Sequence, residues 1–332
     1  MTRLYFDTNI YRYINATSEI KPVLALLSAY DCTLFASSSN LFETYAIACE
    51  DERSRELRAL VTLADAYDDY PESWLHALEL RRAIKRHRPK WLRTVVSKRS
   101  IHDHLKNHRA QWQEAVNGDR PDPASYAQYR RDFEGGIRDG HPLHQRLRQE
   151  LRTKESGIAL NMPGTEPRRI IIDDPEEHWR LESLTAWYGA IEEQRPAARD
   201  YRDWLGPYLR PHAFRDHTYQ DFWFKDVTPE DVPLNRLLGL IGYYQLTKKL
   251  THGNATDQLH ATHWLTKDLF ITADQAFHSI LTTTATNHYP DRTLPALVDR
   301  GATSATEQLH MILDNVTKRP PPPEGRQVIP RR

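Results

Sequence analysis

The sequence predicts an α/β fold with a parallel sheet, interrupted by a mainly helical insertion. Two short apolar runs, at residues 4–6 and 269–272, suit buried strands, and each leads into an aspartate. Strand and helix patterns alternate near both ends of the chain, whereas long helical patterns fill residues 53–231. Because alternating strands and helices favour a parallel sheet, the two ends are expected to fold together.

The first 52 residues read as strand, helix, strand, helix. A strand at 4–6 is followed by helical spacing of apolar residues over 10–27 and by a second strand at 32–37. A serine-rich N-cap region then opens a helix over 41–49, with Glu43 in its first turn. Each of the two strands is thus followed by an acidic residue.

Residues 53–231 form the predicted insertion. Their helical patterns are rich in Arg, His, Trp and Tyr, and a short extra strand is expected at 169–172. Helical spacing over 176–205 places Trp179 and Trp187 on one apolar face. Such a stripe is typical of a core rather than of a ligand site.

The α/β pattern resumes after the insertion. The predicted elements are helices at 234–250 and 256–265, strands at 269–272 and 293–298, and a closing helix at 304–316. We therefore expect one domain built from residues 1–52 and 232–317. The tail at 318–332 is rich in Pro and Arg and is expected to be disordered.

Composition narrows the class of protein. The 332 residues are 39% hydrophobic and 27% charged, as in a globular protein. Lys plus Arg and Asp plus Glu both total 45, which excludes a uniformly basic nucleic-acid binder but leaves local patches open. Cys32 and Cys49 are expected to be free thiols in a reducing compartment. The first residues suit a strand rather than a signal peptide, and no run of about 18 apolar residues occurs, so we expect no membrane segment and a cytoplasmic location.

Four acidic residues lie at the ends of predicted strands or near the starts of predicted helices, where an acid is unexpected unless it has a function. Asp7 and Asp274 follow predicted strands, whereas Glu43 and Asp257 lie near the starts of helices. In an α/β sheet, such positions converge at the carboxyl edge of the strands, where these folds place their sites. Clustered carboxylates repel one another unless a hard divalent cation such as Mg²⁺ or Mn²⁺ holds them. The pattern therefore predicts a metal site.

Four motifs contain these acids: Phe6-Asp7-Thr8-Asn9, Ser37-Ser38-Ser39-Asn40-Leu41-Phe42-Glu43, Asp257-Gln258-Leu259-His260-Ala261 and Phe270-Ile271-Thr272-Ala273-Asp274. In the order and the predicted elements of these motifs, the chain resembles the PIN-domain family of metal-dependent nucleases. The resemblance implies a three-layer α/β/α sandwich with a central parallel sheet, a Mg²⁺ or Mn²⁺ site, and cleavage of RNA or, less often, DNA. It covers only the two ends of the chain, and the insertion separates Glu43 from Asp257 much further than in compact members of the family.

Hydrolysis of a phosphodiester needs an activated water and a neutralised phosphate, and a metal held by carboxylates supplies both. We expect Asp7 and Asp274 to be the principal metal ligands. Glu43 and Asp257 are expected to complete the site directly or through water. Structural roles compete with this assignment, because Asp7 also suits a helix N-cap and Glu43 suits a partner of a helix dipole.

Three further residues near the acids have less specific assignments. Asn9 and Thr272 are expected to orient the carboxylates, although capping or turn hydrogen bonds explain them equally well. His260 lies one helical turn after Asp257. For its ring, a structural hydrogen bond is favoured over catalysis.

A basic stretch at 81–109 is a candidate nucleic-acid surface. Its positive charges suit phosphates, and Trp91 and the histidines suit stacking on unpaired bases. A solvated face with a buried tryptophan is the competing interpretation. The predicted substrate-binding residues are Arg86, Arg88, Lys90, Trp91, Arg93, Lys98 and Arg99.

The expected function is that of a divalent-metal-dependent endoribonuclease, acting as a toxin, in defence or in RNA processing. One alternative is a nuclease for single-stranded or branched DNA. The other is a catalytically silent RNA-binding or scaffold module, against which the four intact acids argue. The sequence does not separate RNA from DNA, because contacts to the 2′-hydroxyl leave no local signature. An antitoxin or other protein partner and a homodimer remain open.

Overall fold

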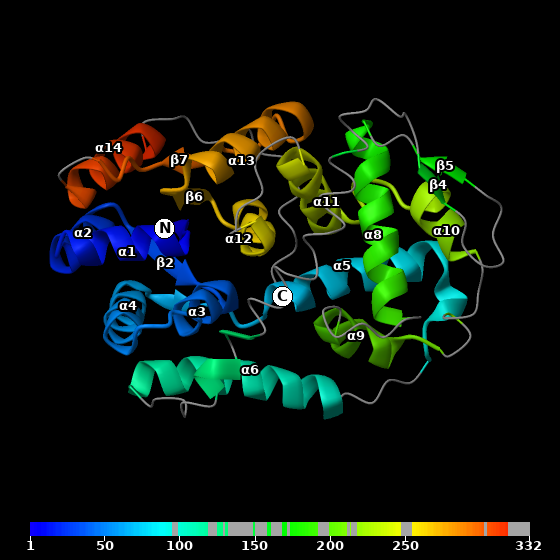
Figure 1. Cartoon of the computed structure of the whole chain (residues 1–332), viewed down its shortest axis with the longest axis horizontal. Helices are drawn as coiled ribbons and strands as arrows, with labels where there is room; N and C mark the ends of the chain where they lie inside the picture. The colour runs from blue at the N-terminus through cyan, green and yellow to red at the C-terminus, as the bar shows by residue number, and fades with distance from the viewer. Residues whose placement is uncertain are drawn as a thin grey trace. The chain divides into compact units, whose positions relative to one another are not determined.

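The chain separates into two compact units, Met1–Asp68 with His263–Arg332, and Asp69–Thr262. We name them the sheet unit and the insertion unit (Figure 1). The first segment of the sheet unit extends to Asp68, beyond the predicted boundary at residue 52. Its second segment begins at His263, later than the predicted boundary at residue 232. The computed structural model describes residues 1–94, 99–118, 125–128, 130, 131, 149, 158–160, 168–170, 173–191, 199–210, 213, 218–246, 254–301 and 304–317.

The sheet unit is built on a five-stranded, all-parallel sheet in the order β3-β2-β1-β6-β7. This confirms the parallel α/β architecture predicted from the sequence. The strands are β1 Thr2–Phe6, β2 Cys32–Ala36, β3 Ala66–Tyr67, β6 Leu269–Thr272 and β7 Ala296–Leu297. β3 was not predicted, because two residues are too few to give a strand pattern, and it carries the sheet unit beyond residue 52.

Helices cover both faces of this sheet. Tyr5 and Phe6 are neighbours in β1, so their side chains point to opposite faces. The Phe6 ring meets Tyr11 of α1, with centroids 5.9 Å apart, and the Tyr5 ring stacks on His263 of α12, with centroids 4.1 Å apart. The unit is therefore layered, with helices on each side of the strands. The helices concerned are α1 Thr8–Ala16, α2 Ile20–Ala29, α3 Ser38–Tyr45, α4 Glu50–Leu63, α13 Gln275–His288, α14 Ala305–Thr317 and, of α12 Asn254–Thr266, the last turn from His263.

Helix α3 begins earlier than predicted. Ser37 and Asn40 form a capping box, in which Asn40 Oδ1 accepts a hydrogen bond from Ser37 N at 3.0 Å. The helix therefore starts at Ser38 and ends at Tyr45, rather than covering 41–49. This places Glu43 in the second turn instead of the first, which removes the helix dipole as the reason for an acid there.

Glu19 holds the closing helix α14 in the sheet unit. Its carboxylate accepts hydrogen bonds from Ser304 Oγ at 3.0 Å, Ala305 N at 3.2 Å and Thr306 N at 2.7 Å. These donors lie at the N-terminus of α14, where backbone N–H groups have no partner within the helix. Burial pulls the pKa of Glu19 upward, but the hydrogen bonds outweigh it and hold the pKa below its ordinary value.

The remaining predictions for the sheet unit concern its C-terminal end. β7 covers only two residues of the strand predicted at 293–298, and α14 agrees within one residue at each end with the helix predicted at 304–316. The tail at 318–332 lies outside the described residues. In the described part of the chain, no helix is long and apolar enough to cross a bilayer.

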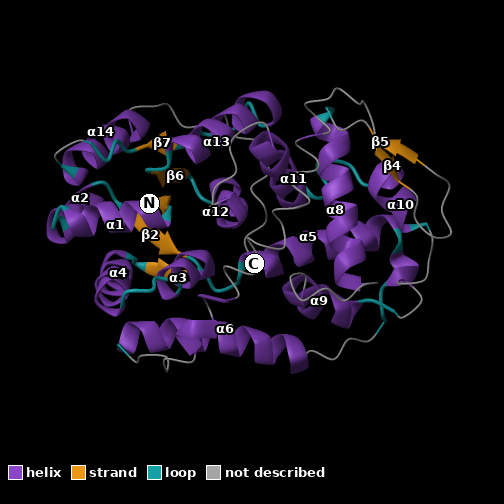
Figure 2. Cartoon of the chain, viewed as in Figure 1, coloured by secondary structure: helices purple, strands orange, loops and turns teal. Residues whose placement is uncertain are grey.

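The described part of the insertion unit is mainly helical (Figure 2). Two short strands pair antiparallel, and the second of them falls on the strand predicted at 169–172. In the region of helical spacing predicted over 176–205, the described residues form α8 and α9. The main elements are α5 Glu72–His87, α6 Arg99–Asn117, β4 Ile158–Leu160, β5 Arg168–Ile170, α8 Pro175–Ile191, α9 Arg199–Leu205 and α11 Pro233–Leu246, with the short helix α10 Tyr219–Asp221.

Two contacts explain why α11 belongs to the insertion unit. Gly239 lets α11 approach α8 closely, because a Cβ atom at this position would lie 2.5 Å from the Cα of Trp179. Glu79 of α5 caps the N-terminus of α11, accepting hydrogen bonds from Leu234 N at 2.9 Å and Asn235 N at 2.6 Å. Burial raises the pKa of Glu79 to about 8, against the opposing effect of these hydrogen bonds. The expectation that this helix folds with the sheet is therefore corrected.

Candidate metal centre

The order of the strands creates a switch point between β1 and β6. From β1 the chain moves outward to β2 and β3, whereas from β6 it moves in the opposite direction to β7. In open α/β sheets, ligands bind in the crevice that this reversal leaves at the carboxyl ends of the strands. Asp7 directly follows β1, and Asp274 follows β6 after one intervening residue. Both predicted acids therefore lie at the switch point.

The Asp7 side chain is buried at this point, with 3% of the residue exposed. Thr272 Oγ1 donates a hydrogen bond to Asp7 Oδ2 at 2.6 Å, and Asn9 Nδ2 donates to the same oxygen at 3.3 Å. Asp7 occupies the N-cap position of α1, but its side chain makes no capping hydrogen bond. Helix capping therefore does not account for this carboxylate, and two neighbouring side chains fix its orientation.

Glu43 brings a second carboxylate to Asp7. An oxygen of Asp7 and an oxygen of Glu43 lie within 4.8 Å of each other. Two negative charges about 5 Å apart repel by roughly 1 kcal/mol in water, and by more where water is partly excluded. Oxygen ligands of one Mg²⁺, with bonds of about 2.1 Å, lie up to about 4 Å apart. A small shift of either side chain would thus let one divalent cation bind both, and the pair fits such an ion.

Asp274 has a structural role that the sequence analysis did not assign to it. Its Oδ1 accepts a hydrogen bond from Phe277 N at 2.8 Å, so it is the N-cap of α13. Its backbone N–H donates to Thr272 Oγ1 at 3.0 Å, so the Thr272 hydroxyl joins Asp274 to Asp7. Among the described residues, Asp274 does not join Asp7 and Glu43 within the same 4.8 Å. The close group at Asp7 therefore includes Glu43 but not Asp274.

The fourth predicted acid lies on α12, a helix that crosses the boundary between the units. The last turn of α12, from His263, belongs to the sheet unit, and the preceding turns belong to the insertion unit. Asp257 is half-buried in the first turn, and His260 is buried. Both residues are thus carried by a helix whose last turn packs against β1.

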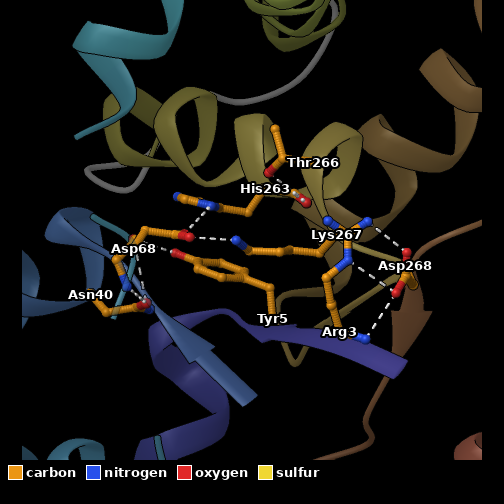
Figure 3. A network of polar contacts seen from close by, with 9 residues as sticks. Arg3, Tyr5, Asn40, Asp68, His263, Thr266, Lys267 and Asp268 are labelled. Carbon is orange, nitrogen blue, oxygen red and sulfur yellow. Dashed lines mark hydrogen bonds and ion pairs between the residues drawn. The ribbon is translucent and has the colours of Figure 1, made fainter. Parts of the chain in front are cut away.

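A second charged cluster fixes that last turn to the sheet (Figure 3). Asp68, which follows β3, lies 2.5 Å from Lys267 Nζ and 3.2 Å from His263 Nδ1. Lys267 is buried, and its Nζ also lies 4.0 Å from the centre of the Phe35 ring. Burial pulls the pKa of Asp68 upward, but the contacts with His263 and Lys267 outweigh it and lower the pKa. No sequence signal pointed to this cluster, because its acid follows the strand that the sequence did not reveal.

Trp91 of the basic stretch is a core residue. It is 1% exposed, and its ring lies 5.9 Å from that of Trp187 and 5.3 Å from that of Phe222. A ring enclosed in this way cannot stack on a nucleic-acid base. The prediction of base stacking by Trp91 is wrong, and the competing interpretation of a buried tryptophan is correct.

Several positive charges of the stretch have acidic partners within the insertion unit. Arg86 pairs with Asp231 at 2.8 Å, and Arg88 pairs with Asp226 at 2.5 Å. Arg93 Nε donates to a backbone carbonyl at 2.6 Å. These contacts favour structural roles for the three arginines over phosphate binding. Of the other predicted residues, Lys90 is exposed, Arg99 opens α6, and Lys98 lies outside the described residues.

Comparisons with known proteins provide no relative for this chain. No protein-family model, no curated protein and no solved structure matches it. The fold and the site together define an α/β protein with a carboxylate pair at the switch point of a parallel sheet. Its chemistry is therefore inferred from this geometry and from the motifs that carry the acids.

Proposed function

We propose that the protein is a divalent-metal-dependent nuclease of PIN-domain type that hydrolyses phosphodiester bonds, with RNA favoured over DNA. The observation that carries the proposal is the approach of Asp7 and Glu43 to within 4.8 Å at the switch point. The burial of Asp7 and the side chains that orient it add support, because an ionised group is costly to bury without a compensating charge. The order of the four motifs along the chain agrees with the same family.

The proposed roles follow the geometry. Asp7 and Glu43 hold Mg²⁺ or Mn²⁺ directly, and Asp274 takes part through water while it caps α13. Thr272 and Asn9 keep the Asp7 carboxylate in one orientation. The cation, when bound, supplies an activated water and neutralises charge on the phosphate. Asp257 is the proposed contribution of α12.

The two other functions are separated from this one by specific results. A DNA nuclease needs the same carboxylates, so only the choice of substrate distinguishes it. A silent RNA-binding module does not need Asp7 and Glu43 in close approach. In such a module, their mutual repulsion would destabilise the fold without serving metal binding. Toxin, defence and RNA-processing roles are all compatible with the site, and so are an antitoxin partner and a homodimer.

The test is cleavage of labelled nucleic acids by the purified full-length protein. Single-stranded RNA, transfer RNA, single-stranded DNA and branched DNA would each be incubated with Mg²⁺, Mn²⁺ or EDTA. We expect metal-dependent cleavage that falls at least ~100-fold in Asp7→Asn and Glu43→Gln. Asp291→Asn, a change to an exposed acid of the sheet unit, should cleave like the parent. Asp257→Asn and His260→Gln test whether α12 contributes to the site.

Folding of the variants must be measured beside cleavage. Asp7→Asn should be as stable as the parent or slightly more stable in EDTA, because the repulsion from Glu43 falls. If Asp7→Asn cleaves as fast as the parent, the metal-site assignment is wrong. If the folded parent cuts none of the substrates, the silent binding module replaces the nuclease.

A further inference from the structure

The Asn40 side chain forms hydrogen bonds to the turn that contains Asp7. The side chain is fully buried, at 0% exposure. Its Nδ2 donates hydrogen bonds to the carbonyl oxygen of Phe6 at 3.1 Å and to Thr8 Oγ1 at 3.2 Å. Phe6 and Thr8 are the residues on either side of Asp7. One amide group therefore holds the turn from β1 to α1 at both neighbours of the buried carboxylate.

The same residue is fixed to the helix that carries Glu43. Asn40 Oδ1 accepts from Ser37 N at 3.0 Å, and the backbone oxygen of Asn40 accepts from Thr44 Oγ1 at 2.8 Å. Glu43 follows Asn40 by three residues, so the two side chains lie on neighbouring positions of α3. Asn40 thus joins the element that supplies one carboxylate to the element that supplies the other.

Strand β1 also contacts the N-terminus of α3 through Tyr5. Tyr5 is fully buried, and its hydroxyl lies 2.8 Å from Ser37 Oγ. Its ring stacks on His263, which contacts Asp68 in the charged cluster of Figure 3. The N-terminus of α3 is therefore held to β1 by a buried polar contact in addition to the bonds of Asn40.

We propose that Asn40 is a positioning residue of the metal centre, whose amide sets the separation between the Asp7 and Glu43 carboxylates. The inference rests on the proposed function. A capping role alone needs only Oδ1, which completes the box with Ser37. The two bonds from Nδ2 contribute nothing to that cap, but they fix the turn around Asp7 relative to α3.

The experiment measures Mn²⁺ binding by the full-length protein, using the electron paramagnetic resonance signal of free Mn²⁺. Asn40→Ala removes the two hydrogen bonds from Nδ2 to the turn around Asp7. We expect it to weaken the affinity for Mn²⁺ about 10-fold, because the loss of a residue that orients a metal ligand has an effect of this size. Thr8→Val, a nearly isosteric change, removes one of the two acceptors and should weaken binding by a smaller factor. Asn15→Ala is the matched control. It removes a hydrogen bond of a side-chain amide in the same unit, from Asn15 Nδ2 to Glu56 Oε1 at 3.0 Å, and should leave the affinity for Mn²⁺ unchanged.

The outcomes separate this inference from the proposed function. Weaker Mn²⁺ binding in Asn40→Ala and Thr8→Val, at unchanged affinity in Asn15→Ala, supports a positioning role. Parent-like affinity in folded Asn40→Ala overturns it, while the metal site itself stands. If Asn40→Ala does not fold, parent-like affinity in Thr8→Val overturns it. A parent that binds no Mn²⁺ refutes the metal site and the inference together.

Discussion

Removal of the Thr272 hydroxyl perturbs the candidate centre without removing an acid. Thr272 is fully buried, donates to Asp7 Oδ2 at 2.6 Å and accepts from Asp274 N at 3.0 Å. Valine has nearly the same shape and keeps the branched side chain that strands favour, so Thr272→Val deletes two hydrogen bonds with little loss of packing. A bond to a carboxylate contributes roughly 1.5–3 kcal/mol and a neutral one about 1 kcal/mol. We therefore expect the free energy of unfolding to fall by about 2.5–4 kcal/mol.

The assay combines urea unfolding in EDTA with Mn²⁺ titration. Because Thr272 orients Asp7, its loss should also weaken Mn²⁺ binding by roughly 10- to 100-fold. Thr284→Val is the matched control, since Thr284 is equally buried but its hydroxyl donates to the carbonyl of Ile280 within α13. That variant should lose at most about 1 kcal/mol and bind Mn²⁺ like the parent. Equal losses of stability and equal affinities in the two variants would refute a special role for the Thr272 hydroxyl.

Three other predictions address the fold around the site. Gly239→Ala should cost about 2–3 kcal/mol in urea unfolding, because the new Cβ meets the backbone of α8 at 2.5 Å, whereas Gly206→Ala, with its nearest contact at 3.7 Å, should cost nothing. Glu19→Gln should destabilise the protein at neutral pH. Since the folded pKa of Glu19 is lowered, its stabilising effect is present above the ordinary value and is lost as the pH falls through the folded pKa, so unfolding curves of parent and variant should converge in acid. Trp91→Ala should cost about 3–5 kcal/mol in thermal or urea unfolding, because it empties a core position. A stable Trp91→Ala that binds RNA less well than exposed Lys90→Ala would restore the nucleic-acid interpretation of the basic stretch.

The strands that border the site were predictable because their patterns are local. The run at 269–272 is apolar at every position but its last and directly follows Asp268, and it forms β6 with the predicted limits. The first strand was equally clear, so the positions of Asp7 and Asp274 at strand ends followed directly from the sequence. β3 could not be predicted, because its two residues form a strand only through pairing with β2, which is distant in the sequence.

Helix limits were less predictable, because side-chain contacts set them. The capping box of Ser37 and Asn40 starts α3 earlier than its apolar residues suggest. Likewise, α11 is strongly apolar and follows a predicted boundary at 232, yet the cap from Glu79 and the close approach at Gly239 bind it to the insertion unit. In both places the deciding partner is a buried polar or glycine contact, which hydropathy does not report.

The sequence by itself determined the class of the fold, the parallel character of the sheet and the acids that stand at its strand ends. These features depend on hydrophobic periodicity and on the residue type at an element boundary, and both are local properties of the sequence. Only the tertiary structure decided that Asp7 lies close to Glu43, that Trp91 is core, and that Asp68 meets Lys267. Each of these is a contact between residues distant in the chain, and the order in which the strands pair brings such residues together.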